Sequence, residues 1–300
     1  MPRSLFLLLY LLLTLSTASQ ANAQATNQAP HLKGQLLDAK TNLPVQYASL
    51  SLLNETNWTL ANVKGHFELA APTKSANDTL LIVCPGYLPR PVVLRNRTLP
   101  DTTLTLERVA TTPKDKPLTP PQPQIRRLGS LAKRPSEGMI QGLMGSQFAL
   151  LMEPSAKHRL GSIRSVSFFI GEGGVPKESF RVRIYRADGP NRSPGTNLLS
   201  ENLVVAASGG GQWFTVDVSK YFVDVPQDGF FVAMEWIVSH EPIDQDGYTP
   251  LNQVLLPTFE FKDSRTWSFT IGKGWNLLTL KTSESRAYNA MIRAEIEELK

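Results

Sequence analysis

Between Gly34 and Tyr87 the apolar residues fall in short runs separated by turn residues, and this spacing constrains the fold more than any other feature. Each run has the length of a β-strand and is too short for an ordinary helix. About seven short strands with such turn spacing predict a β-sandwich. We expect these strands at residues 32–39, 47–53, 59–62, 67–69, 80–83, 92–94 and 104–106.

The turns predict how the first strands pair. Residues 41–44 have turn chemistry and join the first two strands, which we expect to form an antiparallel pair. The third and fourth strands are expected to form a second hairpin, with Gly65 at positive φ and with Phe67 and Leu69 on one face.

The chain begins like an export signal. Arg3 precedes the apolar run 5–15, which is too short to span a bilayer comfortably, and residues 21–23 (Ala-Asn-Ala) fit a signal peptidase site. We expect a signal peptide over residues 1–25, with an uncleaved anchor as the alternative. No transmembrane segment is expected after cleavage.

The charge and the cysteine content exclude some kinds of partner and of stabilising site. The net charge of +5 falls to +4 with the loss of Arg3, and basic residues cluster only in the proline-rich segment 114–134. Nucleic acid is therefore not an expected partner. Cys84 is the only cysteine, which excludes intramolecular disulfides and cysteine-based zinc sites. Its apolar neighbours favour a buried side chain over a reactive thiol.

A proline-rich stretch separates two modules. Five prolines between residues 113 and 123 disfavour both helix and central strand. We assign residues 109–144 to a basic linker and residues 145–300 to a second, larger β-sandwich. Its strands are expected at residues 148–152, 163–170, 180–186, 203–207, 213–218, 229–238, 259–261, 267–271 and 290–297.

Many positions of the first module occur in a recognisable order over residues 31–108. They are Gly34, Leu36, Asp38, Thr41, Pro44, Val45, Ala48, Leu50, Asn62, Gly65, Phe67, Leu69, Asp78, Leu80, Gly86 and Tyr87. In this order they resemble the carboxypeptidase regulatory-like domain, a transthyretin-like sandwich of exported proteins in Bacteroidetes-type bacteria. Trp58 and Val83 depart from that pattern, where the family usually has glycine and often serine. The resemblance implies a seven-stranded sandwich.

Motifs of the second module lie at residues 181–185, 213–219 and 229–236. They are similar to the C-terminal region of exported Bacteroidetes-type proteins, which looks like a jelly roll and has no established activity. The two resemblances imply a cell-envelope protein in the periplasm, on the outer-membrane surface or outside the cell. Thr79 and Thr102 each follow aspartate in a motif similar to the threonine-glycosylation signal of that phylum.

Catalytic motifs are missing from the sequence. A zinc peptidase of the carboxypeptidase kind needs a glutamate three residues after a histidine, and His31, His66, His158 and His240 all lack one. Nucleophile-elbow, phosphate-loop and His-Glu-x-x-His patterns are also absent. We expect no enzyme activity and no cofactor. A hydrolase with a site of dispersed residues in the second module is the alternative.

The acidic loop of Glu235, Glu241, Asp244 and Asp246 is the one candidate metal site. Glu241, Asp244 and Asp246 could begin a calcium cluster, but the pattern lacks the complete hand-type spacing and a solvated loop is favoured.

Tryptophans near turns are the candidate ligand-binding residues. Trp267, Trp275 and Trp58 lie where a ring could be exposed to a sugar, whereas Trp213 and Trp236 lie in apolar strands and are assigned to the core. We expect the partner to be a glycan or an envelope protein.

Overall fold

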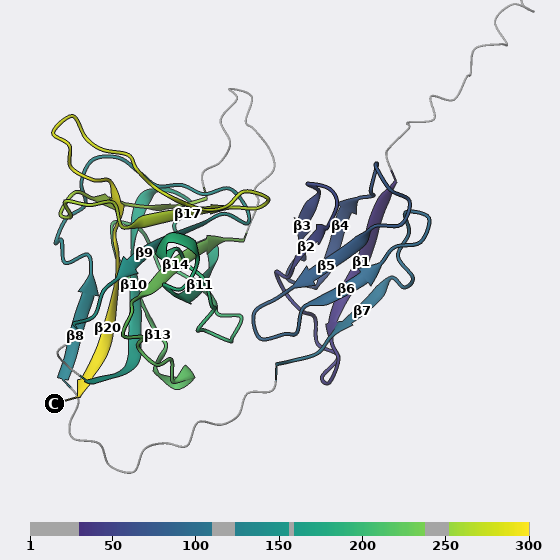
Figure 1. The fold of residues 1–300 in the computed structure, drawn as a ribbon, viewed down its shortest axis with the longest axis horizontal. Coiled ribbons are helices and arrows are strands. Elements are labelled where there is room, and N and C mark those ends of the chain that lie inside the picture. The colour runs from purple at the N-terminus through teal and green to yellow at the C-terminus, as the bar shows by residue number, and fades with distance from the viewer. Residues whose placement is uncertain (1–29, 110–123, 156–158, 238–251, 300) are drawn as a thin grey trace, which may run out of the picture.

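The computed structural model describes residues 30–109, 124–155, 159–237 and 252–299. Within these ranges the regular elements are strands and two short 3-10 turns, η1 (Pro190–Arg192) and η2 (Ser219–Tyr221), so the all-β prediction is confirmed. The strands form two sandwiches, which Figure 1 shows beside one another. No helix in these ranges is long and apolar enough to cross a membrane. The predicted signal peptide lies outside the described residues.

The first domain, residues 30–109, contains seven strands close to the expected positions. One sheet has the order β4-β1-β7 and the other the order β3-β2-β5-β6. The strands are β1 (His31–Asp38), β2 (Ser49–Leu52), β3 (Trp58–Leu60), β4 (His66–Ala70), β5 (Thr79–Val83), β6 (Arg90–Val93) and β7 (Thr103–Leu106).

The strand pairing of this domain differs from the expectation. β1 pairs antiparallel with β4 and parallel with β7, while β2 pairs with β3 and β5, so neither expected hairpin forms. The chain instead crosses between the sheets at both turns, which lets Leu36 and Leu50 meet in the core between them. Gly65 has the expected positive φ of 73°, and a Cβ there would lie 2.4 Å from the carbonyl oxygen of Leu36.

The second domain is a larger sandwich. One sheet has the order β13-β10-β20-β8, with β15 also beside β10, and the other the order β12-β11-β14-β9-β17-β18. β16 and β19 form a separate pair. The strands are β8 (Gln124–Gly129), β9 (Gln147–Met152), β10 (Arg159–Gly174), β11 (Ser179–Arg186), β12 (Val204–Ala206), β13 (Gln212–Asp217), β14 (Phe230–Trp236), β15 (Gln253–Leu255), β16 (Pro257–Thr258), β17 (Thr266–Thr270), β18 (Gly274–Leu277), β19 (Asn289–Ala290) and β20 (Ile292–Leu299).

The core of the second domain lies between its two large sheets. Phe168 on β10 and Ile292 on β20 come from one sheet, and Phe180 on β11 and Phe230 on β14 come from the other. The rings of Phe168 and Phe180 meet edge to face with their centroids 5.3 Å apart. Because strand side chains alternate, the same strands also present outer faces that the core does not use.

Two sequence assignments in this domain are wrong. β8 lies inside the stretch assigned to the linker, residues 109–144, and pairs with β20 along its length. Residues 259–261 form no strand. The strands of this region are the short β15 and β16, which end before residue 259. The sheet therefore begins earlier in the chain than the proline content indicated.

Candidate functional site at the domain junction

The outer face of the six-stranded sheet carries a polar cluster. On β11 every second side chain enters the core, so Arg181, Arg183 and Tyr185 lie on the outer face. Glu235 on β14 is the ladder partner of Arg181, and Gln147 on β9 is the ladder partner of Glu235. These five residues make up the polar cluster.

A buried carboxylate holds the two arginines together. Nη1 of Arg181 lies 2.7 Å from Oε1 of Glu235, and Nε of Arg183 lies 3.2 Å from Oε2. The side chains of Arg181 and Glu235 are 1% and 3% exposed. Charges at this depth are tolerated only when they are paired and hydrogen-bonded. Glu235 is thus part of a buried ion pair and does not belong to the acidic loop.

Tyr185 and Gln147 extend the polar cluster along the sheet. Nε of Arg183 donates to the hydroxyl of Tyr185 at 2.8 Å, and this hydroxyl donates to Oε1 of Gln147 at 2.8 Å. Burial raises the pKa of Tyr185. Burial acts to lower the pKa of Arg183, but its neighbours Tyr185 and Glu235 outweigh that effect and the pKa rises. Both groups therefore keep their ordinary charge at neutral pH.

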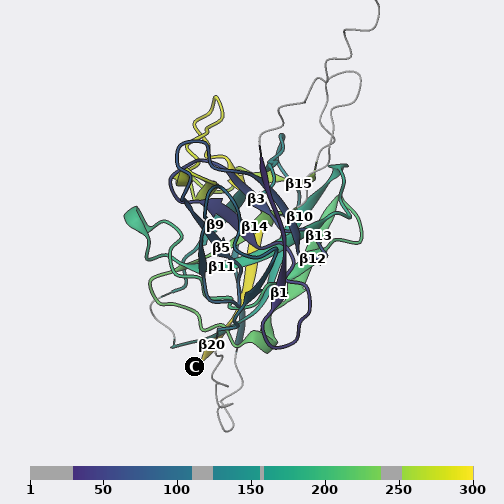
Figure 2. The same cartoon turned by 90° about the vertical axis from the view of Figure 1, so that its right-hand side faces the viewer.

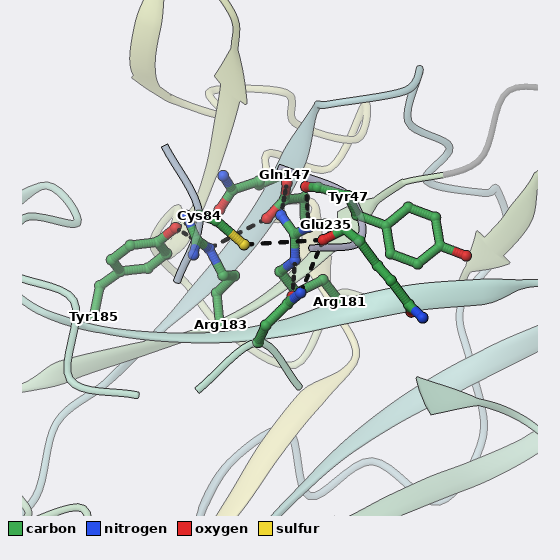
Figure 3. A network of polar contacts seen from close by, with 9 residues as sticks. Tyr47, Cys84, Gln147, Arg181, Arg183, Tyr185 and Glu235 are labelled. Carbon is green, nitrogen blue, oxygen red and sulfur yellow. Dashed lines mark hydrogen bonds and ion pairs between the residues drawn. The ribbon is translucent and has the colours of Figure 1, made fainter. Parts of the chain in front are cut away.

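Main-chain oxygens of the first domain complete the polar cluster. Nη2 of Arg181 donates to the carbonyl oxygen of Tyr47 and Nε donates to Oδ1 of Asn202 at 2.8 Å. Nδ2 of Asn202 in turn donates to the carbonyl oxygen of Gln46 at 3.0 Å. Figure 3 shows Tyr47 and Cys84 of the first domain close to Arg181, Arg183 and Glu235 of the second. The cluster therefore fastens the two domains to each other.

Apolar contacts between the two domains lie beside these hydrogen bonds. Tyr47 and Leu60 of the first domain pack with buried Ile237 of the second. A Cβ on Gly145 would lie 2.9 Å from the ring of Trp58, so backbone and ring are in close contact there. Trp58, expected to have an exposed ring, is half-buried at the domain junction. The view in Figure 2, from the side of the first domain, shows β3 and β5 in front of β9, β11 and β14.

Cys84 lies beside the polar cluster and is buried, as expected from its apolar neighbours. Its sulfur lies 3.9 Å from the carbonyl oxygen of Gln46. Burial raises the pKa of Cys84 to about 11, although Arg181 and Arg183 oppose the rise. The thiol is therefore protonated at neutral pH and is a poor nucleophile.

Trp267 and Trp275 lie on the same outer face, on the terminal strands β17 and β18. Both are half-buried. The ring of Trp275 meets Tyr185 at 5.6 Å and Phe269 at 5.3 Å, and Trp267 meets Phe231 at 6.4 Å. We call Trp267, Phe269 and Trp275 the aromatic face.

The contact between Trp275 and Tyr185 shows that the sheet is curved. Three strands separate β18 from β11, which in a flat sheet would place the two strands about 19 Å apart. Since the ring centroids are only 5.6 Å apart, the sheet curls toward this side. The aromatic face therefore lies beside Tyr185 of the polar cluster and packs on the buried side chains of Ala149, Phe231 and Ala233.

The two tryptophans assigned to the core have different environments. Trp236 is 1% exposed and donates from its indole N–H to the carbonyl oxygen of Gln253 at 2.9 Å, which confirms the assignment. Trp213 is half-buried on the outer face of the other sheet, so its assignment to the core is wrong. The alternation of β13 turns Val216 inward and Trp213 outward.

The candidate calcium ligands Glu241, Asp244 and Asp246 lie outside the described residues. Within the described ranges no three His, Cys, Asp or Glu side chains group as metal ligands would. Of the candidate glycosylation sites, Thr79 is half-buried within β5 and Thr102 is exposed before β7.

The described residues line several shallow grooves. One of about 720 Å³ lies on the first domain and is lined by residues of β1, β3, β4 and β7, which include Lys33, Gln35, His66 and Glu68. Another of about 360 Å³ is lined by residues 88–91 with Thr105 and Glu107. A groove of about 350 Å³ lies between the domains and is lined by residues that include Gln46, Tyr87, Arg108, Glu201 and Asn202. All three open to solvent.

Comparisons with known proteins do not identify a family. No family model and no curated protein matches the chain. One solved structure, described as that of a candidate carbohydrate binding protein from Bacteroides uniformis, is 11% identical, with a TM-score of 0.20. The match covers 75% of this chain and 98% of the other. The chain is all-β, and a likeness at this identity and TM-score carries no argument about its function.

Proposed function

We propose that the protein is an exported, non-catalytic binding protein of the cell envelope, which holds a carbohydrate against the aromatic face. The observation that carries the proposal is the gathering of half-exposed rings from β17 and β18 on one outer face of the sheet. Edge-to-face packing on Tyr185 and Phe231 holds Trp275 and Trp267 in fixed orientations. Rigid rings bind at a low cost in conformational entropy.

The same surface gives little support to a hydrolase. Acid or base catalysis needs a carboxylate that can gain and lose a proton at the reacting bond. In the polar cluster the carboxylate of Glu235 is buried between two arginines. Cys84 is protonated and buried, which also removes the chain's only thiol from nucleophilic chemistry.

A glycan array of neutral polysaccharides tests the proposal, using the full chain and the double variant W267A/W275A. We expect the double variant to lose at least about tenfold in affinity for the glycan that the unaltered chain binds, equal to about 1.4 kcal/mol. The matched control is F222A, which removes an exposed aromatic ring at the end of η2, outside the aromatic face, and should leave this binding unchanged. Near-ultraviolet circular dichroism checks that each variant is folded.

Unchanged binding by the folded double variant would refute the role of the aromatic face. Failure of the unaltered chain to bind any glycan would refute the carbohydrate proposal, and a pull-down from the cell envelope would then search for a protein partner.

A further inference from the structure

The outer face of the β13-β10-β20-β8 sheet contains a stacked arginine. The guanidinium carbon of Arg293 on β20 lies 3.9 Å from the ring centroid of Trp213 on β13. The ring of Trp213 is itself held edge to face against Phe169 on β10, with centroids 5.4 Å apart. The guanidinium is therefore held over a ring that is fixed by the sheet.

Stacking leaves the hydrogen-bond donors of Arg293 free. A guanidinium stacks through its flat face, while its five N–H groups point outward in the plane. Within the described residues, the side chain of Arg293 donates to no protein acceptor and pairs with no carboxylate, in contrast to Arg181. Burial and the nearby Arg127 lower the pKa of Arg293, and Glu295 opposes this. The nitrogens of Arg293 are not among the buried polar atoms that lack a partner, so they reach solvent and are open to an acceptor on a ligand.

The nearby acidic groups already have partners. Oε1 of Glu295 lies 2.7 Å from Nη2 of Arg127, and Oε2 accepts from the hydroxyl of Ser165 at 3.2 Å. Asp217, farther along β13, accepts from the backbone N–H of Ser219 at 2.8 Å. None of these groups forms a hydrogen bond or an ion pair with Arg293.

Hydroxyl groups lie in the same row of the sheet as Arg293. Ser167 on β10 is the ladder partner of Arg293, and Thr215 on β13 is the ladder partner of Ser167. The two hydroxyls are 2.9 Å apart. Thr215 is exposed, so it can exchange hydrogen bonds with a hydroxylated ligand.

We propose that Arg293, Trp213 and Thr215 form a binding site for a carboxylated saccharide of the uronic acid type, in which the buried hydroxyl of Ser167 holds that of Thr215. The free edge of the guanidinium matches the two oxygens of a carboxylate, which it can bind by two parallel hydrogen bonds. The adjoining hydroxyl row suits the hydroxyls of a sugar ring better than an apolar peptide side chain. This site lies on a different sheet from the aromatic face and does not depend on it.

Calorimetric titration of the full chain with a trimer of galacturonic acid tests this site. We expect binding that weakens as salt rises and that falls at least tenfold in R293Q and with the methyl-esterified trimer, which lacks the charge. R293K keeps the charge but loses the paired donors, so it should also bind weakly. The matched control is R286Q, because Arg286 is an exposed arginine paired with Glu284 on another loop.

Equal binding of the acid and the methyl ester, or full binding by folded R293Q, would overturn the proposal. If R293Q fails to fold, T215V replaces an exposed hydroxyl with a methyl of similar size, and unchanged binding by T215V would overturn the role of the hydroxyl row. Inorganic sulfate that binds this site as tightly as the trimer does would also overturn the proposal, since the site would then recognise charge alone. Loss of neutral glycan binding in W267A/W275A with retained trimer binding would separate the two sites.

Discussion

Removal of the Glu235 carboxylate is expected to destabilise the protein strongly. The substitution E235Q keeps the size of the side chain and leaves Arg181 and Arg183 on the buried sheet face without a counter-charge. Breaking a buried ion pair from one side costs about 3–5 kcal/mol. Because E235Q leaves two buried cations without a counter-charge, we expect it to lower the free energy of unfolding by about 5 kcal/mol. R181M leaves no charge unpaired, since Glu235 still pairs with Arg183, and we expect a loss of about 3 kcal/mol.

Urea unfolding followed by circular dichroism and tryptophan fluorescence measures these losses. The double variant R181M/E235Q should cost less than the sum of the single changes, by about 0.5–3 kcal/mol of coupling. R186Q is the matched control on the same strand, because Arg186 and Asp228 form an exposed pair worth about 1 kcal/mol or less. A loss for E235Q as small as that for R186Q, or a coupling of zero, would refute the argument that this buried ion pair stabilises the protein.

Three further changes test separate parts of the structure. Because the pKa of Cys84 is raised to about 11 by burial, iodoacetamide at pH 8 should label the folded protein on the order of a hundredfold more slowly than the urea-unfolded protein, as mass spectrometry would show. The backbone N–H of Thr41 helps to hold the pKa of buried Asp38 well below its usual range, so its contribution to stability is present above about pH 4 and is lost as the pH falls further. D38N should be less stable by about 1.5–3 kcal/mol at pH 7, and thermal unfolding across pH should show this difference shrinking below pH 4. G145A should lower the melting temperature, since its Cβ would lie 2.6 Å from a side chain of the β17–β18 turn, whereas G173A, with open space around its Cβ, should not.

The positions of the strands in the first domain could be predicted from the sequence, but their pairing could not. Alternating apolar residues and turn residues are local signals. Strand pairing depends on which sheet each segment joins, and the chain changes sheets at the turns after β1 and β3. A short turn alone therefore does not distinguish a hairpin from a crossing.

β8 was missed because its partners are distant in sequence. Arg126 and Arg127 follow a proline-rich stretch and look like part of a solvated linker. In the folded protein they pair with Glu298 and Glu295 on β20, more than 160 residues later. Charge pairing across that separation has no local signature.

The sequence predicts Trp267 and Trp275 as ligand-binding residues because they lie near turns, and that role stays a prediction. Their convergence with Tyr185 depends on sheet curvature that the sequence does not show. The polar cluster could not be predicted from the alternation of Arg181 and Arg183 with core residues along one strand. Such alternation ordinarily indicates a face exposed to water, and only the contact with the first domain buries Arg181.

The junction between the domains has a consequence for sequence divergence. Arg181 and Asn202 donate to the main-chain oxygens of Tyr47 and Gln46, and every residue type offers such an oxygen. Substitution of Tyr47 or Gln46 in relatives would leave these hydrogen bonds intact, whereas substitution of Arg181 or Asn202 would remove them. Searches for proteins that share this arrangement should therefore look for the arginine and asparagine of the second domain, and ignore which residues stand opposite them.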